Sequence, residues 1–189
     1  MNAGNYGLAV LLSIQKKWVD LIRSGEKTVD VRKIIPKKVK LPFKCYIYET
    51  KHGGGEGKVI GYFICDMIAA VVSHPRIFAG HDLLHKEAIR RACLTDDDVI
   101  KYANGKDVVG LCISDFHSFS KPKELSELYM PCITPKMPYC PACKCGYEYI
   151  SEGEAEFYRV DGECSTEWIC LNHVKRPPQS WCYVSELRE

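Results

Sequence analysis

The sequence predicts an α+β protein, a small mixed and largely antiparallel β-barrel with helices covering its ends. About six short runs are rich in β-forming residues, and three segments have helical periodicity, with short turns between most of them. The 189 residues suffice for one domain with a small insert, and 46% of them are hydrophobic. This composition excludes a disordered, collagen-like or coiled-coil chain.

A strand and a helix are expected at the start of the chain. Leu8–Ser13 is apolar and short, and no Lys or Arg precedes it, so it is interpreted as a strand rather than a signal peptide. Apolar residues then recur along one helical face through residues 15–24. Ser13 is the expected N-cap of this helix, and Gly25 stands where a C-terminal glycine belongs.

Two more strands are expected next, separated by a basic loop. Thr28–Arg32 alternates with period two, which places Asp30 and Arg32 on one face of a strand. Residues 34–40 contain a proline and several lysines and are predicted to form the loop, and Cys45–Tyr48 is the following strand. The remaining expected elements are a long β run over 59–72 bent near Asp66, helices over 82–92 and 95–102, a β run over 108–119, a short helical piece over 124–128 and a closing strand over 181–184.

Charge is distributed unevenly along the chain. The net charge is +2, but residues 15–51 contain 11 Lys and Arg against 4 Asp and Glu. The rest of the chain holds 15 basic and 20 acidic residues. A basic N-terminal third favours an anionic partner bound by one face, although a solvated basic loop would give the same pattern. No apolar run approaches the ~20 residues that a membrane span needs, so no membrane partner is expected.

Cysteines are concentrated near the C-terminus. Seven of the 11 cysteines lie between Cys132 and Cys182. Because no secretory signal is visible, a cytoplasmic location and a metal site are favoured over disulfides. Two knuckles, the first a CxxC and the second a CxxH, stand 26 residues apart and suit one tetrahedral Zn²⁺ with a structural role. The predicted ligands are Cys140, Cys143, Cys170 and His173, with Cys145 and Cys164 as alternates; unliganded reduced cysteines, an iron–sulfur cluster and disulfides stay open.

The segment Gly25–Arg32 resembles the opening of the ASCH family, relatives of the PUA RNA-binding domain. The family pattern Gly-x-Lys-Thr-x-acid-x-Arg is read here as Gly-Glu-Lys-Thr-Val-Asp-Val-Arg. The resemblance is to bacterial and phage members and covers most of the chain outside residues 131–173. The other blocks that resemble ASCH members are Val39–Glu49, Gly57–Gly61, Ile113–Asp115, Lys121–Leu125 and Arg176–Trp181.

The resemblance implies a PUA-like barrel with a cleft beside the first helix that takes RNA or a nucleoside. Lysine can donate to phosphate, arginine can contact it bidentately, and aspartate can accept from a base amino group. An Asp30–Arg32 surface ion pair with a solvated lysine is the structural alternative. The expected ligand-binding residues are Lys27, Thr28, Asp30 and Arg32, with phosphate contacts from Lys37, Lys38 and Lys40.

Catalysis remains open from the sequence. Some ASCH members resemble amidohydrolases that remove an acyl group from N4 of a modified cytidine, using a lysine, a threonine and a glutamate. Lys27 matches that lysine, but Asp30 stands in the threonine slot, and Thr28 is two positions away; the glutamate has no clear match. Asp30 is expected to raise the pKa of Lys27, which argues against Lys27 as a base. If the chain is an enzyme, its catalytic residues are expected to be Lys27, Thr28 and Asp30.

The sequence therefore predicts a barrel over residues 5–130 plus 174–189, and a zinc-ribbon-like insert over 131–173. The first functional hypothesis is binding of RNA or a nucleotide through the basic cleft. The second is a hydrolase, either the amidohydrolase or a ribonuclease. The third is an adaptor that binds a protein partner through the insert, whose 5 acidic residues between Glu148 and Asp161 are unsuited to phosphate.

Overall fold

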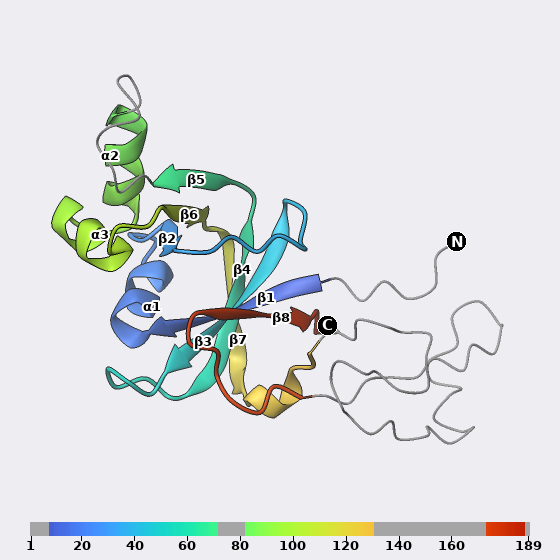
Figure 1. Cartoon of the computed structure of the whole chain (residues 1–189). Coiled ribbons are helices and arrows are strands. Elements are labelled where there is room, and N and C mark those ends of the chain that lie inside the picture. The colour runs from blue at the N-terminus through green and yellow to red at the C-terminus, as the bar shows by residue number, and fades with distance from the viewer. Residues whose placement is uncertain (1–7, 72–81, 131–172, 188–189) are drawn as a thin grey trace, which may run out of the picture.

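The computed structural model describes residues 8–71, 82–130 and 173–187, and the chain forms two β-sheets with three α-helices (Figure 1). A five-stranded sheet has the order β7-β4-β3-β1-β8, and a three-stranded sheet has the order β2-β6-β5. The strands are β1 (Leu8–Gln15), β2 (Val29–Arg32), β3 (Phe43–Thr50), β4 (Lys58–Cys65), β5 (Ile68–Val71), β6 (Val108–Cys112), β7 (Ser114–Lys123) and β8 (Trp181–Ser185). The helices are α1 (Lys16–Arg23), α2 (Asp82–Arg91), α3 (Asp96–Ala103) and the 3-10 helix η1 (Leu125–Glu127).

Strand β1 lies next to the edge strand β8 of the larger sheet. It pairs in parallel with β3 and antiparallel with β8. Val10 and Leu12 enter the core cluster between the two sheets, which Leu111 of β6 also joins. Ala9 and Leu11 enter a second cluster on the other face of the five-stranded sheet. Because both faces of β1 are covered, its sequence is almost continuously apolar.

The long β run predicted around Asp66 is divided between the two sheets. β4 ends at Cys65 and belongs to the five-stranded sheet, whereas β5 begins at Ile68 and pairs with β6. The bend predicted at Asp66 is therefore confirmed, and it marks where the chain leaves one sheet for the other.

Helix α1 begins differently from the sequence prediction. Gln15 is its N-cap and makes no side-chain cap hydrogen bond. The predicted N-cap, Ser13, lies within β1, and its hydroxyl donates to the carbonyl of Pro178 at 2.6 Å. The C-terminal prediction is confirmed: Gly25 has φ of 78°, a left-handed conformation that glycine adopts without strain.

Helices α2 and α3 lie together at one end of the molecule, next to the three-stranded sheet (Figure 1). Ile89 of α2 and Val99 of α3 share a core cluster with Val71 of β5. The predicted capping box at the start of α3 is confirmed, because Thr95 and Asp98 exchange side-chain-to-backbone hydrogen bonds.

The chain just before the predicted insert lies next to His173, the last residue of that insert. Tyr129 and His173 form an isolated antiparallel bridge, and the Val174 N–H donates to the Leu128 carbonyl at 2.9 Å. The predicted insert, apart from His173, lies outside the described residues. Among the described helices, none combines the length and apolar character that a membrane crossing needs.

Candidate functional site

Lys27 lies in the interior, immediately after the turn that ends α1. Its backbone N–H donates to the Leu21 carbonyl at 2.9 Å, which fixes the chain at the helix C-terminus. The side chain is only 3% exposed, and its Nζ donates to the Ala92 carbonyl at 2.7 Å. The same Nζ lies 4.9 Å from the centroid of the Trp18 ring. The ammonium is thus held between α1 and the end of α2.

Burial lowers the pKa of Lys27 below the ordinary value of 10.5. Loss of hydration is the largest cause, and Arg32 adds to it; Asp30 and Cys93 act in the opposite direction. The expectation that Asp30 would leave Lys27 with a raised pKa is therefore wrong. The charge of Asp30 does raise the pKa of Lys27, as predicted, but the desolvation that accompanies burial lowers this pKa by more.

Asp30 and Arg32 share one face of β2, as the period-two pattern predicted. Arg32 Nε donates to Asp30 Oδ2 at 2.6 Å, and both residues are less than 10% exposed. Arg32 Nη1 also donates to the Ser180 carbonyl at 2.9 Å, and Nη2 donates to the Ser13 carbonyl at 3.1 Å. The pair is internal, and the guanidinium ties β2 to β1 and to the approach of β8.

Thr28 is held against the last residue of α2. Arg91 Nε donates to Thr28 Oγ1 at 3.0 Å, and the Thr28 N–H donates to the Arg91 carbonyl at 2.9 Å. The hydroxyl of Thr28 therefore accepts from a guanidinium and keeps its own proton to donate. Thr28 is partly exposed, unlike Lys27, Asp30 and Arg32.

The basic loop, residues 34–40, is docked on β8. The Lys38 backbone N–H donates to the Tyr183 hydroxyl at 2.8 Å, and Trp181 Nε1 donates to the Ile34 carbonyl at 3.0 Å. Because Trp181 directly follows Ser180, the loop lies next to the Arg32 anchor. Three loop lysines, Lys37, Lys38 and Lys40, are exposed.

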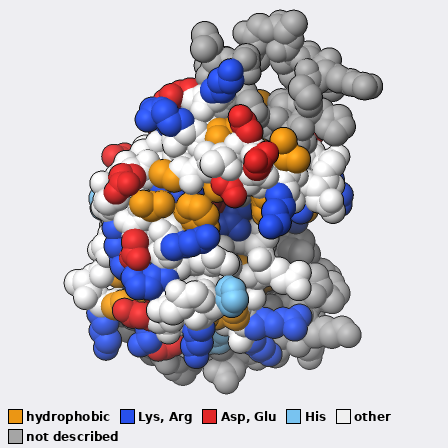
Figure 2. Space-filling view, turned by 90° about the vertical axis from the view of Figure 1, so that its left-hand side faces the viewer, with side chains coloured by type: hydrophobic (Ala, Val, Ile, Leu, Met, Phe, Trp, Pro, Cys, Tyr) orange, Lys and Arg blue, Asp and Glu red, His pale blue; other side chains and the backbone are white. Residues whose placement is uncertain are grey.

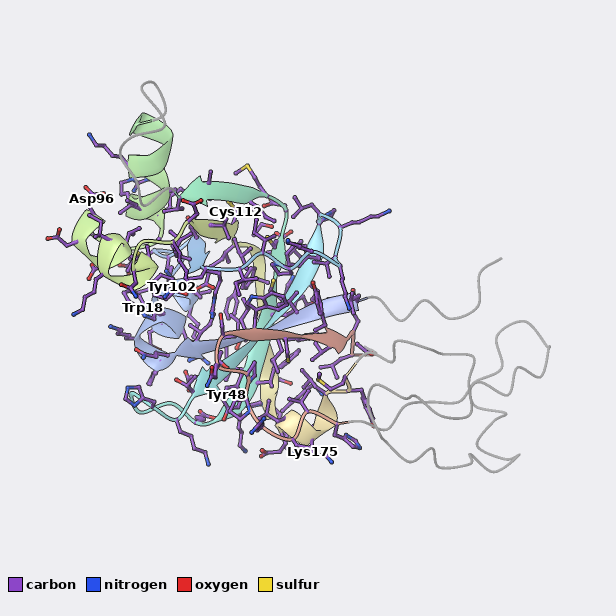
Figure 3. The ribbon with its side chains drawn as sticks, in the orientation of Figure 1. Trp18, Tyr48, Asp96, Tyr102, Cys112 and Lys175 are labelled. Atoms are coloured by element: carbon purple, nitrogen blue, oxygen red, sulfur yellow. The ribbon has the colours of Figure 1, made fainter. Side chains whose placement is uncertain are left out.

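Two aromatic residues of this region were not identified from the sequence as site residues. Trp18 is partly buried against the core, and its ring also receives the ammonium groups of Lys17 and Lys27, at 4.5 and 4.9 Å from the centroid. Tyr102 of α3 is 40% exposed, and Lys33 Nζ lies 4.9 Å from its ring. Figure 3 shows Trp18 and Tyr102 on the same side of the molecule, at α1 and α3. Helical periodicity did not reveal the contacts of Lys27 and Lys33, because these two lysines lie outside the helices that carry the rings.

The surface over these elements is mixed in charge. Figure 2 shows lysine and arginine side chains distributed over this side of the molecule, with acidic and hydrophobic side chains between them. The basic excess of residues 15–51 therefore does not form a uniformly positive patch. An anion would therefore have to be bound by direct contacts with individual lysines rather than by a positive electrostatic potential over the whole surface.

Of the predicted zinc ligands, only His173 lies within the described residues. Cys140, Cys143, Cys145, Cys164 and Cys170 lie outside them. The Nδ1 atom of His173 is buried and has no hydrogen-bond partner among the described residues, while its ring lies 4.5 Å from the ring of Tyr129. In the described ranges, no group of three or more His, Cys, Asp or Glu side chains is arranged to hold a metal ion.

The five cysteines of the described ranges are free thiols: Cys45, Cys65, Cys93, Cys112 and Cys182. Burial raises the pKa of Cys65 to about 12 and that of Cys182 to about 11. Both therefore remain protonated at neutral pH, whereas metal binding and nucleophilic attack require the thiolate.

Comparison with solved structures identifies the fold. The ASCH protein from Zymomonas mobilis is similar with a TM-score of 0.53 and 19% identity, over 96% of this chain and 88% of that one. Two variants of the same protein, one with a tyrosine replaced by phenylalanine and one with a serine replaced by alanine, are similar with the same TM-score and 18% identity, over 91% and 89% of their own chains. No protein-family model matches this chain, and no curated protein does. The predicted α+β fold of ASCH proteins is confirmed.

Proposed function

We propose that this protein binds RNA or a nucleotide-like ligand at the surface formed by the basic loop, the C-terminal turn of α1 and α3. The observation that carries the proposal is the connection of the loop to the Arg32 anchor through consecutive residues of the β8 approach. Ser180 accepts from Arg32, and Trp181 binds the loop backbone at Ile34. The loop lysines are thereby presented from a fixed base rather than from a free segment.

The residues have two different roles in this proposal. The exposed amines of Lys37, Lys38 and Lys40 contact phosphates, which are the dominant source of affinity for nucleic acids. Lys27, Asp30 and Arg32 form the floor of the site. An ammonium has three N–H donors, and the bond from Lys27 to Ala92 uses one of them. Thr28 offers a partly exposed hydroxyl at the margin of that floor.

The test is the salt dependence of RNA binding by the basic loop. A variant with Lys37, Lys38 and Lys40 replaced by alanine is titrated with a fluorescent single-stranded RNA between about 50 and 200 mM salt. Each lost phosphate contact is expected to reduce the slope of log affinity against log salt by about 1. Lys51→Ala, which removes an exposed lysine from the β3–β4 turn, is the matched control. An unchanged slope and affinity in the triple variant would overturn the proposal.

The lowered pKa of Lys27 favours a second candidate, a hydrolase. In amide hydrolysis on an N4-acylated cytidine, Thr28 Oγ would attack the acyl carbon while a neutral Lys27 takes the hydroxyl proton. The C–N4 bond then breaks, N4 receives that proton, and water releases the acyl group from Thr28. Asp30, held by Arg32, would position the site. A ribonuclease is the other form of this candidate.

The two forms of the hydrolase are separated by their substrates. Purified protein is incubated with N4-acetylcytidine and with single-stranded RNA, and the products are followed by chromatography. Lys27→Arg keeps a cation and hydrogen-bond donors but cannot act as a base near neutral pH. Loss of turnover with retained RNA binding in Lys27→Arg is the expected result for an enzyme. Absence of turnover of both substrates by the unchanged protein would rule the hydrolase out.

We also propose a structural Zn²⁺ site over Cys140, Cys143, Cys170 and His173, with Cys145 and Cys164 as alternate ligands. Three thiolates and one imidazole are a usual ligand set for structural zinc. The buried Nδ1 of His173, which has no partner within the described ranges, supports it, because a metal would satisfy that atom. Native mass spectrometry before and after chelation should show one zinc mass that disappears. In this proposal the insert over 131–173 is a unit for a protein partner, and Cys140→Ser should abolish capture of that partner while RNA binding persists.

A further inference from the structure

A second candidate site lies on the other face of the five-stranded sheet. A cavity of about 310 Å³ opens there, which is at the lower end of the range for small-ligand sites. Tyr46 belongs to the core cluster of this face, whereas its neighbours Cys45 and Ile47 belong to the cluster between the sheets. The cavity is lined by Tyr46, Tyr62, Phe119, Ser120, Lys121, Lys123 and Leu187.

Aromatic rings from three adjacent strands form the wall of this cavity. Tyr46 of β3 and Tyr62 of β4 are register partners, with ring centroids 5.9 Å apart. Phe119 of β7 lies 6.0 Å from Tyr62 and 6.4 Å from Tyr46. His117 stacks on Tyr62 at 4.9 Å but does not line the cavity, so it supports the ring from beside the site. A flat heteroaromatic ring is the ligand group that such a wall accommodates best.

Lysines surround the same cavity. Lys121 and Lys123 line it, and Lys44 Nζ lies 4.5 Å from the centroid of Tyr62. Two carboxylates offset part of this charge: Lys123 lies 3.5 Å from Glu127, and Lys44 lies 3.7 Å from Glu186. Lys121 is exposed and has no ion pair with any described residue. The rim therefore has an excess positive charge beside an aromatic wall.

Tyr46 is held in place by burial and by a hydrogen bond from the backbone of Leu187. Its side chain is 1% exposed, and its hydroxyl accepts from the Leu187 N–H at 2.8 Å. Leu187, which lines the cavity two residues after the end of β8, is therefore tied to Tyr46. A wall of preorganised rings loses little conformational entropy when a ligand binds.

We propose that this cavity binds one nucleotide unit, with its base against Tyr62 and Phe119 and its phosphate near Lys121 and Lys123. Base stacking on aromatic side chains beside lysines is the usual means of binding single-stranded nucleic acid without sequence preference. The site goes beyond the function proposed above, because it uses different residues on a different face. The nucleotide belongs either to a single RNA strand or to a free mononucleotide, since both offer the same base and phosphate.

The experiment combines photo-crosslinking with titration in the variant that lacks Lys37, Lys38 and Lys40. In this background, binding by the basic loop does not obscure the second site, and failure of one proposal does not affect the other. A short oligouridine containing 5-iodouridine is irradiated with the protein, and crosslinked peptides are identified by mass spectrometry. Uridine 5′-monophosphate is titrated separately by NMR.

Two variants and one control test the roles of ring and charge. Phe119→Leu keeps an apolar side chain of similar size but removes the ring, and it should weaken binding by about tenfold, within the range measured for base stacking. Lys121→Ala should weaken it less and reduce the salt slope by about 1. Lys86→Ala, an exposed lysine on α2 and outside both proposed sites, should have no effect.

Each outcome decides the proposal. Crosslinks to Tyr62 or Phe119 with the oligonucleotide alone support a site for an RNA strand. Phe119-dependent binding of the mononucleotide supports a site for a free nucleotide. Crosslinks confined to other residues, or equal affinity of Phe119→Leu and the background protein, overturn the proposal. Circular dichroism of Phe119→Leu checks that the sheet is retained.

Discussion

The guanidinium of Arg32 joins three separate parts of the chain. Its acceptors are the carboxylate of Asp30, the carbonyl of Ser13 and the main-chain and side-chain oxygens of Ser180. A planar group with five donors can satisfy such a set, whereas an ammonium cannot match its geometry. Arg32 therefore stabilises the barrel at the position where the basic loop begins.

Replacing Arg32 by methionine should strongly destabilise the protein. The change leaves the carboxylate of Asp30 buried without its cation, and loss of one member of a buried pair costs about 3–5 kcal/mol. Urea unfolding measures the change in the free energy of unfolding. The double variant with Asp30→Asn should lose less than the sum of the single losses. Additive losses would show that the pair is not coupled.

The buried ammonium of Lys27 gives a second prediction, which concerns pH. Since its folded-state pKa lies below the 10.5 of an exposed lysine, the unfolded chain binds more protons between these two values. The contribution of Lys27 to stability should therefore rise as pH increases through that window. Unfolding free energies of the wild type and Lys27→Met, measured across the alkaline range, should diverge in favour of the wild type. A constant difference would contradict the lowered pKa.

The residue types of the site were predictable, but their burial was not. The period-two pattern correctly placed Asp30 and Arg32 on one face of β2. The partners on that face are distant in sequence. Ser180, which accepts from Arg32, is 148 residues further along the chain, and Ala92, which accepts from Lys27, is 65 residues away. Local spacing carries no information about such partners, so the burial of Asp30 and Arg32 could not be predicted from it.

At the scale of secondary structure, most boundaries follow from local signals. The capping box of α3 and the glycine after α1 were identified from residue types alone, because their hydrogen bonds are made within a few residues. The N-terminus of α1 was not, because Ser13 continues β1 and its hydroxyl is used by Pro178. A tertiary partner thus overrode a local capping preference.

The capping box of α3 gives the third prediction. Thr95→Ala removes the oxygen that accepts from the Asp98 N–H, and it should lower the free energy of unfolding by about 1 kcal/mol. Thermal or urea unfolding measures the loss. Thr95→Ser keeps the hydroxyl and should be near wild type. If α3 positions Tyr102 at the proposed RNA surface, Thr95→Ala should also weaken RNA binding more than Thr95→Ser does.

At the scale of the whole molecule, the bridge between Tyr129 and His173 supports the proposed division into barrel and insert. Tyr129 and His173, on either side of residues 131–172, lie next to each other, which is the geometry that permits insertion of a unit. The barrel then needs only a short connection across this position.

Deletion of residues 131–172 gives the fourth prediction. With a short Gly-Ser linker between Met130 and His173, the barrel should remain folded, because the strands of both described sheets lie outside the deleted segment. Thermal unfolding followed by circular dichroism tests this, and native mass spectrometry should show no zinc. Insoluble or unfolded protein would mean that the deleted residues are part of the barrel.

The pairing of β1 with β8 has a consequence for synthesis of the chain. Leu8 is paired with Ser185, so one edge of β1 has no partner until residue 185 has been made. During that time an apolar strand exposes its backbone N–H and C=O groups, which is the usual starting point for aggregation. During the same interval the guanidinium of Arg32 lacks its acceptor at Ser180. A ribosome stalled shortly before β8 would therefore hold a chain that can form much of its interior but cannot close it.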